Sequence, residues 1–169
     1  LASGDTLIVT GTLTQQTDLN SYGTANGLIT LNGGTIEVRG NVVIGVGANG
    51  GTVKFLLNGT TDQTYSWTSG AGRLAGLEIN KASGSVLPAA GTTGLAVADF
   101  TLTAGTFTAP STSFDSTAFT MAAGTSFSAP PTHYVGGNFT ITSGATYTHN
   151  NVTLYFNTWD CYGVTLTID

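Results

Sequence analysis

The stretches GTFTAP (105–110), GTSFSAP (124–130) and GATYTHN (144–150) decide the fold of this chain. Each stretch begins with a glycine and carries one aromatic residue, and these aromatics, Phe107, Phe127 and Tyr147, lie twenty residues apart. Self-similarity at a fixed period of about twenty residues is typical of a solenoid, because a single coil of this size cannot bury its own apolar side. The sequence therefore predicts coils that stack on one another.

A second alternating run precedes each of these glycines, and reads FTLTA (100–104), FTMAA (119–123) and FTITS (139–143). Apolar residues at every second position, with Thr or Ser between them, have the two-residue period of a strand with one buried face. The segment LEINKASGSVL (77–87) repeats the same two-part unit with Val86 in the place of the aromatic residue. We expect the residues of the two runs to stack as a core ladder: Val86, Phe107, Phe127, Tyr147, Phe100, Phe119 and Phe139.

Three short strand segments per coil, joined by Gly, Ala-Pro or Asn-Asn corners, predict a parallel β-helix of about twenty residues per coil, so that 169 residues would form about eight coils. The prediction is a single β-solenoid domain over residues 1–169, with looser coils over 1–80, regular coils over 81–157 and a C-terminal strand over 158–169. An antiparallel β-sandwich is the alternative, since it also has many short strands, but it does not predict aromatics at a fixed spacing. A short helix around Ala71–Gly76 is the one helical segment left open.

Charge and composition exclude several classes of partner. Only 8% of the residues are charged, the net charge is -5, and all four basic residues precede position 82. Nucleic acid and anionic membrane surfaces are therefore not expected as partners. No apolar run is long enough for membrane insertion. A hydroxyl-rich, lysine-poor chain with one cysteine is typical of an exported protein, so we expect it to be secreted or on the cell surface.

The sequence offers no convincing catalytic or metal site. Such sites on β-helices need converging carboxylates. Two acidic pairs are candidates, Glu78 with Asp99 and Asp99 with Asp115, which lie 21 and 16 residues apart; of these two only the first fits the period, and no basic partner is expected beside it. The Asp-Asp, Gly-His-Gly and Arg-Ile-Lys signatures of polygalacturonases are missing. His133 and His149 lack neighbouring carboxylate or cysteine ligands and are expected at coil corners as solvated or capping imidazoles. We expect a protein without enzymatic activity, metal or cofactor.

Three stretches, YVGGNFTITSGATYTHNNVTLYFN (134–157), GGTVKFLLNGTTDQTYSW (50–67) and LAGLEINKASGSVL (74–87), are similar to the repeats of large exported bacterial surface proteins. In those proteins, units of the type Gly-Asn-Phe-Thr, Gly-Thr-Phe-Thr and Leu-x-Ile-Asn follow one another. The resemblance covers about residues 33 to 157. It implies a β-solenoid of the filamentous-haemagglutinin or adhesin type that is secreted or on the cell surface and has no catalytic activity.

Both terminal strands, expected over 6–14 and 164–168, contain no Lys, Arg or Pro, residues that usually protect exposed sheet edges. Unprotected edges predict a homopolymer, in which subunits join head to tail into a surface or matrix filament. The alternative is that flanking repeats of a longer array cover these edges. Cys161 is either a small buried hydrophobe or a thiol at a subunit junction. The interface candidates are Leu7, Val9, Leu13, Cys161, Val164, Leu166 and Ile168.

Two further functions remain open. A glycan-binding module or adhesin segment would stack exposed aromatic rings on sugar rings, and would present two or more rings on one flat face. The candidates for this role are Tyr65, Trp67, Tyr134 and Trp159. A viral fibre or tailspike segment would instead associate side by side in threes.

Overall fold

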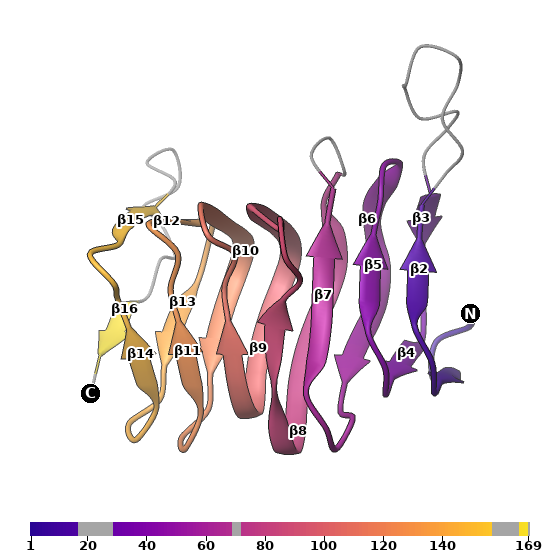
Figure 1. The fold of residues 1–169 in the computed structure, drawn as a ribbon, viewed down its shortest axis with the longest axis horizontal. Coiled ribbons are helices and arrows are strands. Elements are labelled where there is room, and N and C mark those ends of the chain that lie inside the picture. The colour runs from indigo at the N-terminus through magenta and orange to yellow at the C-terminus, as the bar shows by residue number, and fades with distance from the viewer. Residues whose placement is uncertain (17–28, 69–71, 157–165, 169) are drawn as a thin grey trace.

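The computed structural model describes residues 1–16, 29–68 and 72–156, and the backbone of 166–168. The chain is a parallel β-solenoid of about 6 turns, with about 21 residues per turn and no helix in these described ranges. Its coils stack in chain order from the N-terminal to the C-terminal end (Figure 1). Every strand pair is parallel, so the β-helix prediction is confirmed and the antiparallel sandwich is wrong.

The strands follow one another in the order β1 (Thr6–Val9), β2 (Leu13–Gln15), β3 (Ile29–Leu31), β4 (Thr35–Val38), β5 (Val42–Ile44), β6 (Ala48–Leu57), β7 (Gln63–Trp67), β8 (Leu74–Pro88), β9 (Gly94–Thr108), β10 (Ser113–Met121), β11 (Ser126–Ser128), β12 (Thr132–Val135), β13 (Phe139–Ile141), β14 (Thr146–Thr148), β15 (Thr153–Phe156) and β16 (Leu166–Ile168).

These strands form three faces around one core. Face A runs from β1 through β4, β6, β8, β9, β10 and β13 to β16. Face B runs from β2 through β5, β7, β8, β9 and β11 to β14. Face C runs from β3 through β6, β8, β9, β10 and β12 to β15. The long strands β6, β8, β9 and β10 bend at a corner and contribute to more than one face.

Glycine makes the corner between face A and face B in the regular coils. Gly105, Gly124 and Gly144 have φ angles of 92°, 76° and 84°, which lie in the left-handed region that a side chain disfavours. Because the corner falls at the same place in each coil, the strands on either side of it keep their register. The repeated glycine at the head of each aromatic run is therefore a turn residue, as the sequence predicted.

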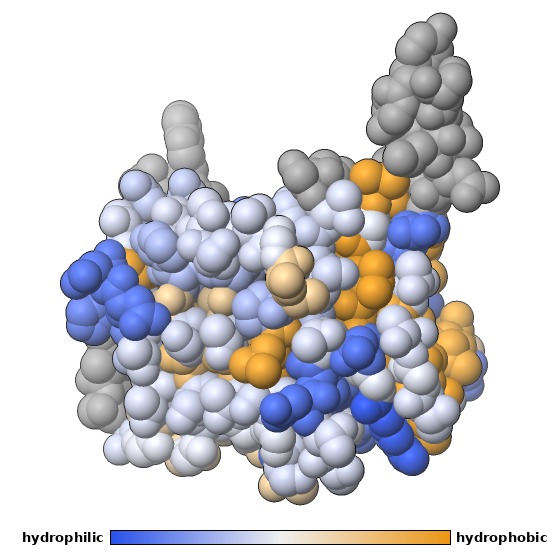
Figure 2. Space-filling model, in the orientation of Figure 1, coloured by the Kyte–Doolittle hydropathy of each residue, from blue (hydrophilic) through white to orange (hydrophobic). Residues whose placement is uncertain are grey.

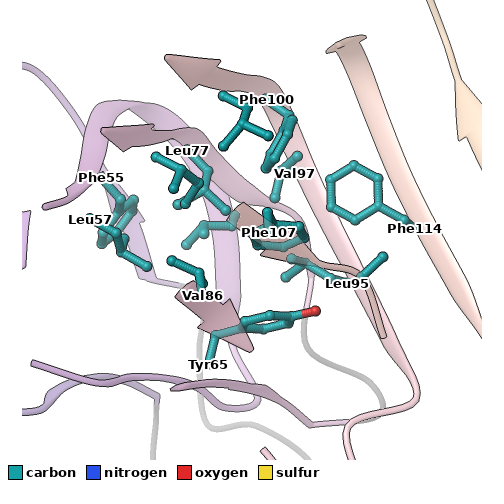
Figure 3. Packing of buried hydrophobic residues seen from close by; sticks show 14 of the residues in the cluster. Phe55, Leu57, Tyr65, Leu77, Val86, Leu95, Val97, Phe100, Phe107 and Phe114 are labelled. Atoms are coloured by element: carbon teal, nitrogen blue, oxygen red, sulfur yellow. The ribbon is translucent and has the colours of Figure 1, made fainter. Parts of the chain in front are cut away.

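The predicted ladder is present as two columns. On face B, Val86 pairs with Phe107, and the rings of Phe107, Phe127 and Tyr147 stack with centroids 5.7 and 5.4 Å apart and planes within 15° of parallel. Figure 3 shows Val86 and Phe107 pointing into the interior with the residues of the other faces. Stacking of equivalent residues buries each ring against the coils before and after it, which is how a solenoid makes a continuous core.

The second column lies on face A. The Phe100 ring stacks on Phe119 and the Phe119 ring on Phe139, with centroids 5.2 and 5.0 Å apart. Toward the N-terminus the same column continues through Leu77, Phe55 and Ile36, all of them buried. The core is therefore aromatic in the C-terminal half and mainly aliphatic in the N-terminal half.

Three expectations about the elements need correction. The segment considered for a helix enters strand β8 at Leu74, while Ala71 lies outside the described residues. The expected N-terminal strand over 6–14 is two strands, because the chain turns at a corner where Gly40 of the next coil lies against the backbone of Gly11. The solenoid has about 6 turns, where about eight coils were expected.

His133 was expected at a solvated corner, and this is wrong. Its side chain is fully buried in β12, in the column of Phe114. Strand β12 begins at Thr132, directly after the Pro130-Pro131 corner, so the alternation of the strand turns the imidazole inward. Its Nδ1 lies 2.9 Å from the Tyr147 hydroxyl, and no hydrogen-bond partner is recorded for Nε2 among the described residues. Burial lowers the pKa of His133 to about 3.

Lys81 is a second polar group inside the solenoid, with 2% of its surface exposed. The ammonium donates to the carbonyl oxygen of Thr61 at 2.9 Å, to Gln63 Oε1 at 2.8 Å and to the carbonyl oxygen of Gly59. Burial lowers the pKa of Lys81, and the charge of Asp62 acts in the opposite direction. These three oxygens compensate for the water molecules that the ammonium loses on burial.

Candidate functional site

The two ends of the rod carry the exposed sheet edges. In the described part of the chain, six strands have a neighbour on one side only: β1, β2 and β3 at the N-terminal end, and β14, β15 and β16 at the C-terminal end. Each of the three faces therefore has one open edge at each end, in the pairs β1 and β16, β2 and β14, and β3 and β15.

The coil formed by β1, β2 and β3 exposes part of the core. Leu7 occupies the same inward column as Ile36, yet 47% of its surface is exposed, because no described coil covers it. Ile8 is 50% exposed, whereas Val9 and Leu13 are partly buried against the core. Apolar residues also reach the surface near the N-terminal end on the side shown in Figure 2. The predicted interface residues of this end therefore lie together.

The open edge of β1 has free backbone groups at defined positions. The carbonyl of Asp5 accepts from the Thr35 amide and the carbonyl of Val9 accepts from the Arg39 amide, both at 2.8 Å. In a parallel ladder the residues of one strand point alternately to either neighbour. The N–H and C=O groups of Thr6 and Ile8 therefore point away from β4, toward the open edge.

At the C-terminal end, β16 continues the face A columns. Leu166 pairs with Phe139 and Ile168 with Ile141, so the two predicted interface residues of this strand hold the register positions that Leu7 and Val9 hold at the other end. The remaining candidates of this end, Cys161 and Val164, lie outside the described residues.

The predicted glycan-contact residues are not all on the surface. Tyr65 is 4% exposed, stacks on Phe107 and donates its hydroxyl to the Thr108 carbonyl at 2.9 Å, so its assignment as an exposed ring is wrong. Burial raises the pKa of the Tyr65 hydroxyl. Trp67 is half-buried, and its Nε1 donates to the Gly72 carbonyl at 3.2 Å. Trp159 lies outside the described residues.

Tyr134 is exposed and has a partner that the sequence reasoning missed. Its ring stacks on Tyr155 of the next coil, with centroids 4.8 Å apart and planes 19° from parallel. The two residues are 44% and 47% exposed. Asp115 precedes them in the same outward column of face C. Phe114 pairs with His133, and Asp115 pairs with Tyr134. Tyr134 is therefore one residue further along its strand than the partner of Phe114. Because side chains alternate along a strand, Phe114 points inward and Tyr134 points outward.

Arg73 lies at the other end of this column. The strand register places Ala96 between Arg73 and Asp115, and this small side chain lets the guanidinium reach across one coil. Arg73 donates to Asp115 Oδ1 at 2.6 Å, to the Val97 carbonyl at 2.9 Å and to Thr117 Oγ1 at 2.7 Å. Arg73, Asp115, Tyr134 and Tyr155 are among the residues around a hollow of about 460 Å³.

The carboxylate pair considered for catalysis is not arranged as the spacing suggested. Glu78 pairs in register with Thr101, not with Asp99. Its carboxylate forms an ion pair with Lys54 at 2.8 Å, so a basic residue is present beside it, contrary to expectation. Within the described ranges, no three His, Cys, Asp or Glu side chains are grouped as a metal site would require. The same ranges contain no helix with the length and apolarity of a membrane span.

Comparison with known proteins gives no assignment: no family model matches the chain, and no curated protein or solved structure is significantly similar to it. The β-solenoid expected from the similarity to filamentous-haemagglutinin-type repeats is present. Membership of that group remains an expectation from the sequence.

Proposed function

We propose that this chain is a non-catalytic, extracellular structural protein, whose subunits stack head to tail into a filament of the cell surface or matrix. The observation that carries the proposal is the matching of the two open ends. Among the described strands, each of the three faces has one open edge at each end of the rod. Exposed edges of this kind pair with strands of other chains unless they are protected.

The register positions of face A also match across such a joint. When β16 of one copy is placed beside β1 of the next, Leu166 falls next to Leu7, and Ile168 next to Val9. The apolar column of face A then continues from one subunit into the next. The joint uses different surfaces on the two subunits, so it is heterologous and builds an open filament unless the rotation between subunits closes a ring.

The extracellular location is part of the same proposal and rests on composition. The second half of the chain has no Lys or Arg, and its outward positions are rich in Thr and Ser. Such a surface has few sites for trypsin-like proteases, which favours a role outside the cell.

The test is assembly of the purified chain, followed by negative-stain microscopy and light scattering over a range of concentrations. We expect threads for the wild type. Replacing Ile8 with proline removes an N–H from the open edge of β1 and leaves the hydrogen bonds to β4 in place, since those use Asp5, Leu7 and Val9. Ile8→Pro should therefore yield folded monomers.

Ile8→Lys is a second variant that places a charge on the same edge without changing the backbone. The matched control is Ser111→Lys, which adds the same charge at an exposed corner in the middle of the rod and should leave assembly unchanged. Circular dichroism checks that each variant is folded. Wild-type material that stays monomeric at every concentration, trimeric side-by-side spikes, or threads formed equally by both Ile8 variants would contradict the proposal.

A further inference from the structure

We propose that the column of Arg73, Asp115, Tyr134 and Tyr155 on face C is a binding site for a neutral saccharide chain that lies along the rod. This site runs along the outward side of the solenoid and ends at Tyr155 on β15, the open-edge strand of face C at the C-terminal end. It combines two exposed aromatic rings with an anchored ion pair around one hollow of about 460 Å³.

The two exposed rings of the column lie together. Outside the N-terminal coil, Tyr134 and Tyr155 are the only large hydrophobic residues that the described part of the chain leaves exposed, and they lie side by side. All the other tyrosines and phenylalanines of the regular coils are buried or half-buried. Exposed apolar surface gathered in one place on an otherwise polar protein indicates an interaction site.

The ion pair of the column offers polar groups to a ligand. Three hydrogen bonds hold the Arg73 guanidinium, so its orientation is fixed before any ligand binds. Asp115 uses Oδ1 for Arg73, and within the described residues no partner is recorded for Oδ2. The Tyr134 and Tyr155 hydroxyls likewise have no recorded hydrogen bond there. The column thus offers a carboxylate acceptor, guanidinium donors and two hydroxyls that face solvent.

The column is long and straight. Asp115, Tyr134 and Tyr155 lie on the successive strands β10, β12 and β15, about 4.8 Å apart, and Arg73 lies just before β8, two strand steps from Asp115. Four strand steps join Arg73 to Tyr155, which gives a strip of about 19 Å. The length and straightness of this strip suit several sugar rings in a linear chain rather than one compact ligand.

The combination of exposed aromatic rings with a carboxylate and a guanidinium is suited to a saccharide ligand. The C–H face of a pyranose ring is apolar and packs on an aromatic side chain, while its hydroxyls both donate and accept hydrogen bonds. Carboxylate and guanidinium groups form strong, directional bonds with such hydroxyls. Because Arg73 is already neutralised by Asp115, and the whole chain carries a net charge of -5, a polyanionic glycan would be repelled rather than attracted.

Affinity electrophoresis in gels that contain xylan, galactomannan or hydroxyethyl cellulose tests this proposal, with polygalacturonate as the anionic comparison. At least one neutral polysaccharide should retard the wild type. Tyr134→Ala and Tyr155→Ala should each weaken that binding about three- to tenfold. Tyr134→Phe keeps the ring and should retain most of the affinity. Thr132→Ala, a small change on the same strand β12, is the matched control and should bind like the wild type.

A second measurement needs no variant. Nitration of tyrosines in the wild type, mapped by mass spectrometry, should modify Tyr134 and Tyr155, and a bound polysaccharide should protect both. Three results would overturn the proposal: no retardation by any of the neutral polysaccharides, equal binding by wild type and a folded Tyr134→Ala protein, or tighter binding of polygalacturonate. None of these results depends on filament formation, because the Ile8→Pro monomer carries the same column and can be used in both measurements.

Discussion

Replacing His133 with phenylalanine is expected to make this solenoid resistant to acid. In the folded chain the imidazole is enclosed by Phe114, Phe119, Phe127 and Tyr147, with ring centroids 4.8 to 6.1 Å away. These neighbours bring no charge to the imidazole, so burial disfavours the protonated form and lowers the pKa of His133 to about 3. In the unfolded chain the pKa returns to about 6.5.

The sign and size of the effect follow from this difference in pKa. The folded-state pKa is depressed, so the stabilising contribution of neutral His133 is present above about pH 6.5 and is lost as the pH falls toward 3. Between about pH 7 and about pH 4, the free energy of unfolding should decrease by about 3 kcal/mol on account of this residue alone. Phenylalanine at the same position does not titrate and continues the ladder of Phe114.

Urea unfolding at the two pH values, followed by circular dichroism, measures this difference. At about pH 7 we expect His133→Phe to lie within about 2 kcal/mol of the wild type, because it loses the bond to Tyr147 but also removes a buried nitrogen without a recorded partner. His149→Gln, at an exposed position, is the control and should lose as much stability in acid as the wild type. If His133→Phe loses as much as well, the buried imidazole is not the source of acid sensitivity.

Two other changes test the packing of the corners. Lys81→Met removes the donor shared by Gly59, Thr61 and Gln63, and should lower the free energy of unfolding by about 3 kcal/mol in urea titrations at neutral pH; an unchanged value would mean that the ammonium is not needed. Gly84→Ala should lower the melting temperature, because the residue has a φ of 73° and a Cβ there would lie 2.7 Å from the carbonyl carbon of Thr61. Its control, Gly11→Ala, has open space and should melt like the wild type, whereas equal losses in both variants would contradict the steric explanation.

The sequence was sufficient to predict the solenoid, because the core residues of such a fold recur at a fixed spacing along the chain. Phe107, Phe127 and Tyr147 had to meet once the coil length was about twenty, and the register confirms that they do. The same period also predicts a column of outward-facing residues on face C. Asp115, Tyr134 and Tyr155 are spaced by nineteen and twenty-one residues, so they fall in one outward column by the same rule.

Whether a given side chain points inward or outward depends on the residue at which each strand begins. The repeat period alone does not define that residue. His133 was assigned to a corner because prolines precede it, but the strand starts one residue earlier and turns the ring inward. Tyr65 was expected on the surface as a glycan-contact ring, yet it pairs with Pro88 on face B and packs on Phe107. The ion pair of Arg73 with Asp115 spans 42 residues, and it forms only because the intervening position is the small Ala96.

The stacking of coils connects the acid sensitivity to the two proposed functions. Each coil of a solenoid contacts only its neighbours, so stability is lost coil by coil. His133 lies on β12, in the same coil as Tyr134, and touches Tyr147 of β14, one of the three open edges at the C-terminal end. Protonation of this one imidazole therefore weakens both the exposed tyrosine pair and the end that the proposed filament needs, while the aliphatic coils near the N-terminus contain no equivalent histidine in the described residues. Filament assembly and saccharide binding should consequently weaken together in acid, although the first uses backbone edges and the second uses outward side chains.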